Sequence, residues 1–159
     1  MTTRILQATV RASAADVIGR LGDDLAFPEY ANDIVSVTDT GDGLRTWVLA
    51  FRGGAATWTQ GTRRPDGDPL RIEFTQLNGE FQHLIGSWTT VDTADGCEIT
   101  FEVRFSTSVP HLAGAIDSAV GRVLVRAAHQ IISAVGGPAR VTNGGHLLWD
   151  LAEKTPSPV

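Results

Sequence analysis

Seven segments of the chain have the alternating pattern or the bounding turn residues of β-strands. In Glu98–Ser106, the hydrophobic residues Ile99, Phe101, Val103 and Phe105 alternate with polar ones, which predicts a strand with one buried face. Turns rich in glycine, proline, asparagine and aspartate separate the later segments, so we expect them to pair as antiparallel hairpins. The predicted strands are Arg4–Arg11, Ile34–Asp39, Leu44–Arg52, Ala55–Arg63, Leu70–Leu77, Phe81–Val91 and Glu98–Ser106.

The last long apolar segment, His111–Val135, has a helical period instead. Its apolar residues recur at steps of three and four, at Leu112, Ile116, Val120, Val123, Ala127, Ile131 and Ala134. Pro110 precedes the segment and Gly136-Gly137-Pro138 follows it, as expected at the two ends of a helix. Such a helix is about 35 Å long, and only the predicted sheet is large enough to cover its apolar face. We therefore expect an α+β protein in which a curved, seven-stranded antiparallel sheet closes over one long helix.

Two short helices are predicted between the first strand and the second. Ser13 is a suitable N-cap for a helix that carries a small apolar stripe and ends at Gly22. The sequence Phe27-Pro28-Glu29-Tyr30 predicts a second short helix, because proline fits the first turn. Within the long strand Phe81–Val91, Gly86 predicts a bend or a bulge.

Composition indicates one domain. The chain has 159 residues, of which 42% are hydrophobic and 19% charged, enough to build a single core. We expect a ligand-binding domain at residues 1–137. Residues 138–159 then form a tail that is either docked or disordered.

Charge and cysteine content indicate the kind of partner and the cellular compartment that we expect. A formal net charge of −5 argues against nucleic acid and anionic membranes, so we expect a neutral or apolar small-molecule partner. Cys97 is the single cysteine, which predicts a reducing compartment, the cytoplasm. We see no signal peptide and no segment of membrane-spanning length.

Several motifs resemble a known family. Phe27-Pro28-Glu29-Tyr30-Ala31, Leu84-Ile85-Gly86-Ser87-Trp88, and Phe105 followed by Pro110-His111-Leu112 resemble the polyketide cyclase/aromatase and coenzyme Q-binding branch of the START/Bet v 1-like (SRPBCC) superfamily. The order of predicted elements is likewise that of its helix-grip fold. In aromatase/cyclases of this branch, a strand reading Trp-x-Ser-x-x-Arg or Trp-x-Ser-x-Arg places a polar and a cationic side chain in the cavity. Here Gln60 stands at the serine position and Thr62 at the arginine position of the shorter spacing, while Arg63 points to the opposite face.

The resemblance implies an internal cavity that binds a hydrophobic polyketide and promotes its aldol cyclisation and dehydration without a cofactor. An acyl carrier protein would then be a second partner. The alternative is a non-catalytic carrier of a lipid, a quinone or another aromatic molecule. The oligomeric state stays open between a monomer and a homodimer.

For a cyclase, three residues are candidates for the chemistry. His129, late in the long helix, is the candidate base for a proton beside a ketone, and Gln60 and Tyr30 are candidate hydrogen-bond donors. Each has a plainer interpretation: His129 and Tyr30 as residues half in solvent, and Gln60 as a buried amide with structural partners.

The candidate substrate-binding residues form a larger set. Aromatic and aliphatic residues on the inner face would line the cavity or simply fill the core, and Arg52 would stabilise an enolate or lie at the surface. The set comprises Phe27, Arg52, Trp58, Thr62, Leu84, Trp88 and Phe101. The four histidines are scattered and no cysteine pair exists, so we expect no metal site.

Overall fold

The computed structural model describes residues 1–67, 69–107, 113–146 and 148, with the backbone alone at residues 113–115. Eight strands in the described residues form one sheet in the order β2-β3-β4-β5-β6-β7-β1-β8, and neighbouring strands are antiparallel. Their bounds are β1 Thr2–Val10, β2 Ile34–Gly41, β3 Leu44–Phe51, β4 Gly54–Arg63, β5 Leu70–Gly79, β6 Phe81–Asp92, β7 Cys97–Thr107 and β8 Arg140–Asn143. The predicted antiparallel hairpins are confirmed.

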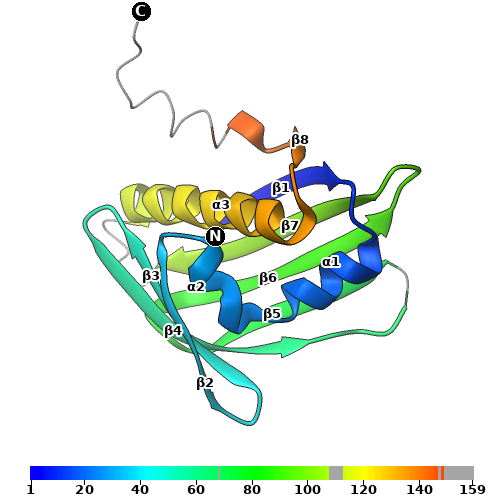
Figure 1. The fold of residues 1–159 in the computed structure, drawn as a ribbon. Coiled ribbons are helices and arrows are strands. Elements are labelled where there is room, and N and C mark those ends of the chain that lie inside the picture. Colours follow the sequence, from blue (N-terminus) through cyan, green and yellow to red (C-terminus); the bar gives the residue numbers. More distant parts are fainter. Residues whose placement is uncertain (68, 108–112, 147, 149–159) are drawn as a thin grey trace, which may run out of the picture.

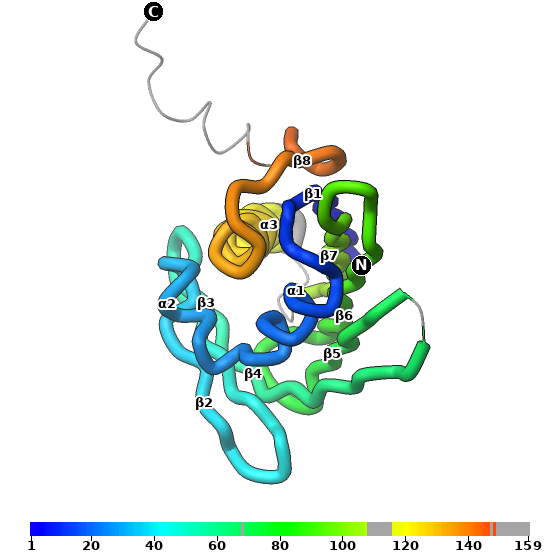
Figure 2. Tube along the Cα trace, turned by 45° about the vertical axis from the view of Figure 1, so that its right-hand side comes forward, coloured from blue at the N-terminus to red at the C-terminus, as the bar shows by residue number. Residues whose placement is uncertain are grey.

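The helices lie on one side of the sheet. They are α1 (Ala14–Leu21), the 3₁₀ turn η1 (Asp24–Ala26), α2 (Phe27–Tyr30) and α3 (Ala113–Gly136). Figure 1 shows α3 crossing the sheet, with α1 and α2 beside it. Figure 2, seen nearly along α3, shows the strands curving around this helix. The predicted α+β architecture of a curved sheet around one long helix is confirmed; the predicted helix start, at His111, lies outside the described residues.

The core lies between α3 and the concave face of the sheet, where the apolar face of the helix packs on the apolar face of the strands. In β1, Leu6, Ala8 and Val10 are buried, while the alternate positions are less buried. The helix α3 packs against β1 and β7. Its buried residues in the described part are Asp117, Val120, Gly121, Val123, Leu124, Val125, Ala127, Ala128, Ile131, Ile132 and Val135.

The strand β8 corrects the predicted strand number from seven to eight. It pairs with β1 at the edge of the sheet, through Ala8 and Val141 and through Thr9 and Arg140. Only four residues long and without strict alternation, it has no strand signal of its own. The unpaired backbone groups at the edge of β1 provide its hydrogen-bond partners.

Gly86 is not the site of a bulge. It pairs in regular register with Phe74 of β5 and Val103 of β7, and the irregularity in β6 lies between Phe81 and His83. A Cβ atom at Gly86 would lie 2.3 Å from the Phe74 ring and 2.6 Å from the backbone oxygen of Glu102. Glycine is needed here because the Phe74 ring occupies the space above its backbone.

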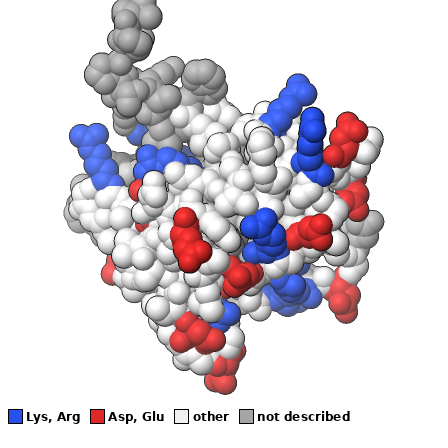
Figure 3. All heavy atoms as spheres, viewed as in Figure 1, with Lys and Arg blue, Asp and Glu red and all other residues white. Residues whose placement is uncertain are grey.

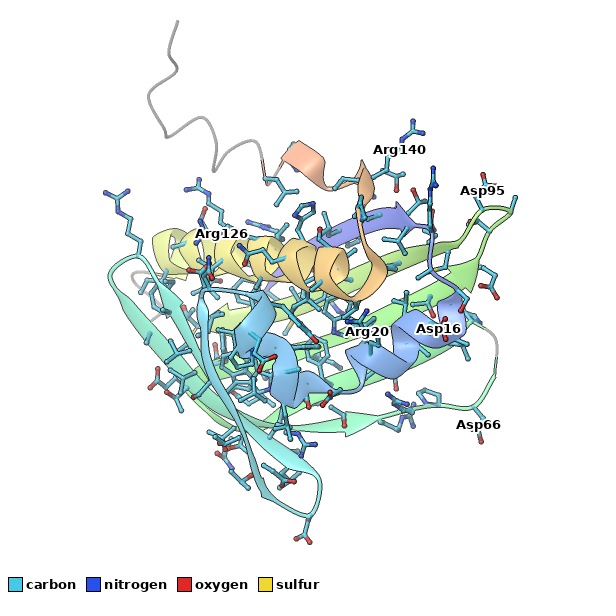
Figure 4. The ribbon with its side chains drawn as sticks, in the orientation of Figure 1. Asp16, Arg20, Asp66, Asp95, Arg126 and Arg140 are labelled. Atoms are coloured by element: carbon cyan, nitrogen blue, oxygen red, sulfur yellow. The ribbon has the colours of Figure 1, made fainter. Side chains whose placement is uncertain are left out.

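Polar contacts hold the helices over the sheet and so define the space beneath them. On α1, the Arg20 guanidinium donates to the backbone oxygen of Val135 at the end of α3, over 2.9 Å. On α3, Arg126 donates through Nε to Asp33, just before β2, over 2.9 Å. Figure 4 labels both arginines, on their two helices. These contacts tie α1 and the start of β2 to α3.

Candidate functional site

A cavity lies between α3 and the concave face of the sheet. The cavity has a volume of about 90 Å³, and the space among its side chains is about 820 Å³ when the open mouth and the adjoining solvent are included. Every strand from β2 to β7 contributes to its lining, as do α1, η1, α2 and α3. The fold therefore encloses the cavity that the curved sheet and the long helix predicted.

Aromatic rings in mutual contact form part of its wall. Trp47 of β3 stacks on Trp58 of β4, and Trp88 of β6 contacts Phe101 of β7 with ring centroids 4.7 Å apart. Phe27 of α2 connects the two pairs, because its ring meets both Trp47 and Trp88 edge-on. The wall thus offers large, flat apolar surfaces from two pairs of strands on the concave face of the sheet and from a helix.

One end of the cavity is polar. Asp24 of η1, Arg45 of β3 and Gln60 of β4 line it there, and Asp24 is only 7% exposed. Arg45 donates through Nε to Asp24 Oδ1 over 3.0 Å, and its Nη1 lies 3.3 Å from Asp39 Oδ2. Arg45 is the register partner of Gln60 across the β3–β4 pair, so the two side chains emerge side by side.

Burial raises the pKa of Asp24, despite the opposing hydrogen bond and charge of Arg45. The neighbouring carboxylate of Asp23 contributes in the same direction as burial. A desolvated carboxylate in a cleft is a frequent property of functional sites, and here it lies at the polar end of a largely apolar cavity.

Gln60 is 4% exposed and has a partner for one end of its amide. Its Oε1 accepts a hydrogen bond from the indole Nε1 of Trp58 over 2.9 Å. This bond orients the amide and leaves its NH₂ group as the donor end. The indole Nε1 of Trp47, next to Trp58, is buried with no hydrogen-bond partner.

The exposed lining residues mark the mouth, which lies beside the polar end. They are Gly22, Thr62 and Arg64. The Arg64 guanidinium crosses from the end of β4 to α1, where it donates to the backbone oxygen of Ile18 over 3.3 Å. A Cβ atom at Gly22 would lie 1.5 Å from Arg64 Nη2, so glycine at this position makes room for the arginine.

The structure brings together most of the residues predicted for the site, and leaves others outside. The predicted residues on the cavity lining are Phe27, Trp58, Gln60, Thr62, Leu84, Trp88 and Phe101. Whether a ligand touches them stays a prediction. Arg63 points to the outer face, as strand alternation predicted, and pairs there with Glu73.

Tyr30, Arg52 and His129 are not among the lining residues. Arg52 is exposed in the turn after β3, and Tyr30 is half-buried at the end of α2. His129 is half-buried, and the helix turns Ala127, Ala128 and Ile131 towards the cavity in its place. Its position therefore does not support the prediction that it is the base.

Sequence reasoning did not single out Asp24, Arg45, Trp47 or Arg64 as site residues. A signal existed for Arg45, which shares the period-two phase of Trp47 and Leu49 and therefore their face of the strand. Asp24 had none, because the burial of a carboxylate in a short turn depends on what packs over it.

Charges are interspersed on the face seen in Figure 3, where acidic and basic side chains lie among a larger uncharged surface. In the part of the chain that the structure describes, no group of three or more His, Cys, Asp or Glu residues could hold a metal ion. None of the described helices is long and apolar enough to cross a membrane.

The fold and its cavity define a protein of the START/Bet v 1 helix-grip class. The chain belongs to the family described as polyketide cyclase/dehydrase and lipid transport, whose model matches residues 11–132. No curated protein sequence matches the chain.

Solved structures agree with this fold. TTHA0849 from Thermus thermophilus is 16% identical, with a TM-score of 0.72 over 85% of this chain and 94% of that one. A START superfamily protein from Mycobacterium smegmatis is 13% identical, with a TM-score of 0.70 over 84% and 95%. The ZhuI aromatase/cyclase from Streptomyces sp. R1128 is 19% identical, with a TM-score of 0.67 over 84% and 94%. At these identities the likeness is one of fold.

Proposed function

We propose that this protein binds a polyketide-like molecule in its cavity and promotes the cofactor-free aldol cyclisation and dehydration of that molecule. The observation that carries the proposal is the form of the cavity: an aromatic wall that ends in the polar side chains of Asp24, Arg45 and Gln60. A simple apolar store would not need a buried carboxylate and a guanidinium beside the ligand.

Each part of the cavity has a role in this reaction. The aromatic wall restricts a flexible poly-β-ketone chain to few folded conformers, which brings the reacting carbons together. The polar end provides hydrogen-bond donors for carbonyl oxygens on which negative charge develops. No step needs a metal, a redox cofactor or a second substrate, because the aldol reaction rearranges bonds within one chain.

Binding of a quinone, a lipid or another aromatic molecule without reaction is the second candidate. Thr62 favours it, because a short hydroxyl stands where similar aromatase/cyclases have an arginine. The aromatic wall suits both functions, so binding alone does not distinguish them.

Two measurements test the proposal in order. Polycyclic phenols and quinones should quench the fluorescence of the tryptophans in the cavity wall in a saturable titration. Absence of quenching at every soluble concentration contradicts the polyketide proposal and the binding of quinones or other aromatic molecules. The protein should then change the cyclised products of a reconstituted polyketide synthase. Quenching without any change of products would favour the carrier.

A further inference from the structure

Asp24 differs from every other side chain on the cavity lining in its chemistry. The remaining lining residues are apolar, aromatic or glycine, apart from Arg45, Arg64, Gln60 and Thr62. Guanidinium, amide and hydroxyl side chains are not among the usual general bases. Among the described residues around the cavity, Asp24 is therefore the one group that can act as a base on a bound molecule.

The surroundings of Asp24 orient its carboxylate. The Arg45 guanidinium binds one of its oxygens, Oδ1, over 3.0 Å, and Asp39 holds that guanidinium from the other side at 3.3 Å. Arg45 hydrogen-bonds to Oδ1 and not to Oδ2 of this carboxylate. A base fixed by a second group resembles the general pattern of an oriented catalytic base.

The charges around Asp24 adjust its basicity in opposite directions. Burial and the adjacent Asp23 raise the pKa of Asp24, and Arg45 lowers it. Asp39 stands behind Arg45, and Arg64 is the other cation on the lining. A raised pKa makes the carboxylate a better proton acceptor, while the bond to Arg45 favours its charged form.

Hydrogen-bond donors line the same cavity as this base. Gln60 faces Arg45 across the strand pair, and its amide is oriented by Trp58 so that the NH₂ group is the donor end. Trp47 adds a buried indole N–H that has no partner. An oxyanion of a ligand could accept hydrogen bonds from these donors. Such a bond would give the buried Trp47 N–H the acceptor that it lacks.

We propose that Asp24 is the proton acceptor of this cavity and that Arg45 and Gln60 stabilise the oxyanion formed from a 1,3-dicarbonyl ligand. This inference rests on the proposed function of the cavity, and assigns to Asp24 the role that sequence analysis assigned to His129. Asp24 takes the proton from the carbon between two carbonyls, and the C–H electron pair becomes an enolate. The enolate carbon bonds to a third carbonyl carbon, and the resulting alkoxide takes the proton back from Asp24.

A small diketone isolates the first of these steps. The probe is 1-phenylbutane-1,3-dione in D₂O, and NMR measures the exchange of its C2 protons above the rate without protein. Tryptophan quenching measures its binding in the same samples. The variants are Asp24→Asn, which keeps the shape of the side chain, and Asp24→Glu, which keeps a carboxylate. The control is Asp95→Asn, which removes an exposed carboxylate in the turn between β6 and β7.

We expect Asp24→Asn to reduce protein-dependent exchange by about 10²-fold or more while the dissociation constant of the probe stays close to wild type. Asp95→Asn should retain exchange, and Asp24→Glu should retain part of it. Wild-type exchange should rise with pH through the raised pKa of Asp24. This profile tests the assignment even if Asp24→Asn does not fold.

Two outcomes overturn different statements. Wild-type protein that binds the probe but exchanges it no faster than Asp24→Asn, or a rate that does not follow the titration of one carboxyl group, overturns the role of Asp24 and leaves ligand binding intact. If the probe does not quench the tryptophan fluorescence of the wild-type protein, the result contradicts the proposed function for 1,3-dicarbonyl ligands. It then also contradicts the role of Asp24.

Discussion

Trp47 of β3 stacks on Trp58 of β4, with ring centroids 5.6 Å apart and planes inclined by 20°. The two residues are register partners, and the pair two positions along is Arg45 and Gln60. Because side chains two residues apart lie on the same face of a strand, the indole stack and the polar pair share the cavity side of the sheet. The pairing of β3 with β4 thus places the aromatic wall and the polar end of the cavity next to each other.

The hydrogen bond within this patch predicts how its stability responds to mutation. Gln60→Leu should lower the free energy of unfolding by about 1–3 kcal/mol, because the buried Trp58 indole N–H loses its acceptor. Trp58→Phe in the Gln60→Leu background should cost less than Trp58→Phe alone, since the double variant leaves neither polar group unpaired. Urea denaturation of the four proteins measures this cycle. Strictly additive effects would mean that the bond contributes nothing to stability.

Gly86 predicts a second stability effect. Gly86→Ala should lower the free energy of unfolding by about 1–3 kcal/mol, because the new methyl group meets both the Phe74 ring and the Glu102 backbone oxygen. The matched control is Gly19→Ala, at an exposed position of α1 where a Cβ atom meets nothing within 4 Å. Helix propensity predicts that the control is stabilised by up to about 1 kcal/mol. Equal melting temperatures for the two variants would contradict the close packing over Gly86.

The raised pKa of Asp24 predicts a pH dependence of stability. Because the folded state holds this proton more tightly than the unfolded chain, whose ordinary pKa is 3.8, deprotonation costs folding free energy. Relative to Asp24→Asn, the wild type should therefore lose stability as pH rises from 3.8 through the folded pKa of Asp24. Below this window the aspartate is protonated in both states and its contribution is complete. Denaturation of both proteins across this range measures the difference, and a difference independent of pH would show that the pKa is not raised.

His129 offers a direct comparison of the two candidate bases. His129→Ala should leave both the exchange of the diketone probe and the synthase products unchanged, because Ala127, Ala128 and Ile131 occupy the cavity side of α3. Losing a true general base would cost about 10²–10⁴-fold instead. If His129→Ala loses exchange activity by that factor while its melting temperature and its affinity for the probe are unchanged, His129 is the base after all.

Much of the fold could be predicted from local patterns. The alternation in β7 and the helical period of α3 both reflect which face of an element is buried, so they are present in the sequence itself. Turn residues marked the ends of the hairpin strands because their backbone preferences are also local. The short strand β8 escaped prediction because its pairing depends on the free edge of β1, which is remote in sequence.

The residues of the site also fall into those that local sequence patterns predicted and those that only tertiary packing placed. Strand alternation alone determined that Trp58 and Gln60 share a face and that Arg63 points away from it, since this depends only on the period of a strand. Only the tertiary structure decided that Asp24 is buried against Arg45 and that His129 turns away from the cavity. The burial of a side chain in a turn, and the rotation of a helix over a sheet, are set by packing between segments distant in sequence, which no local pattern records.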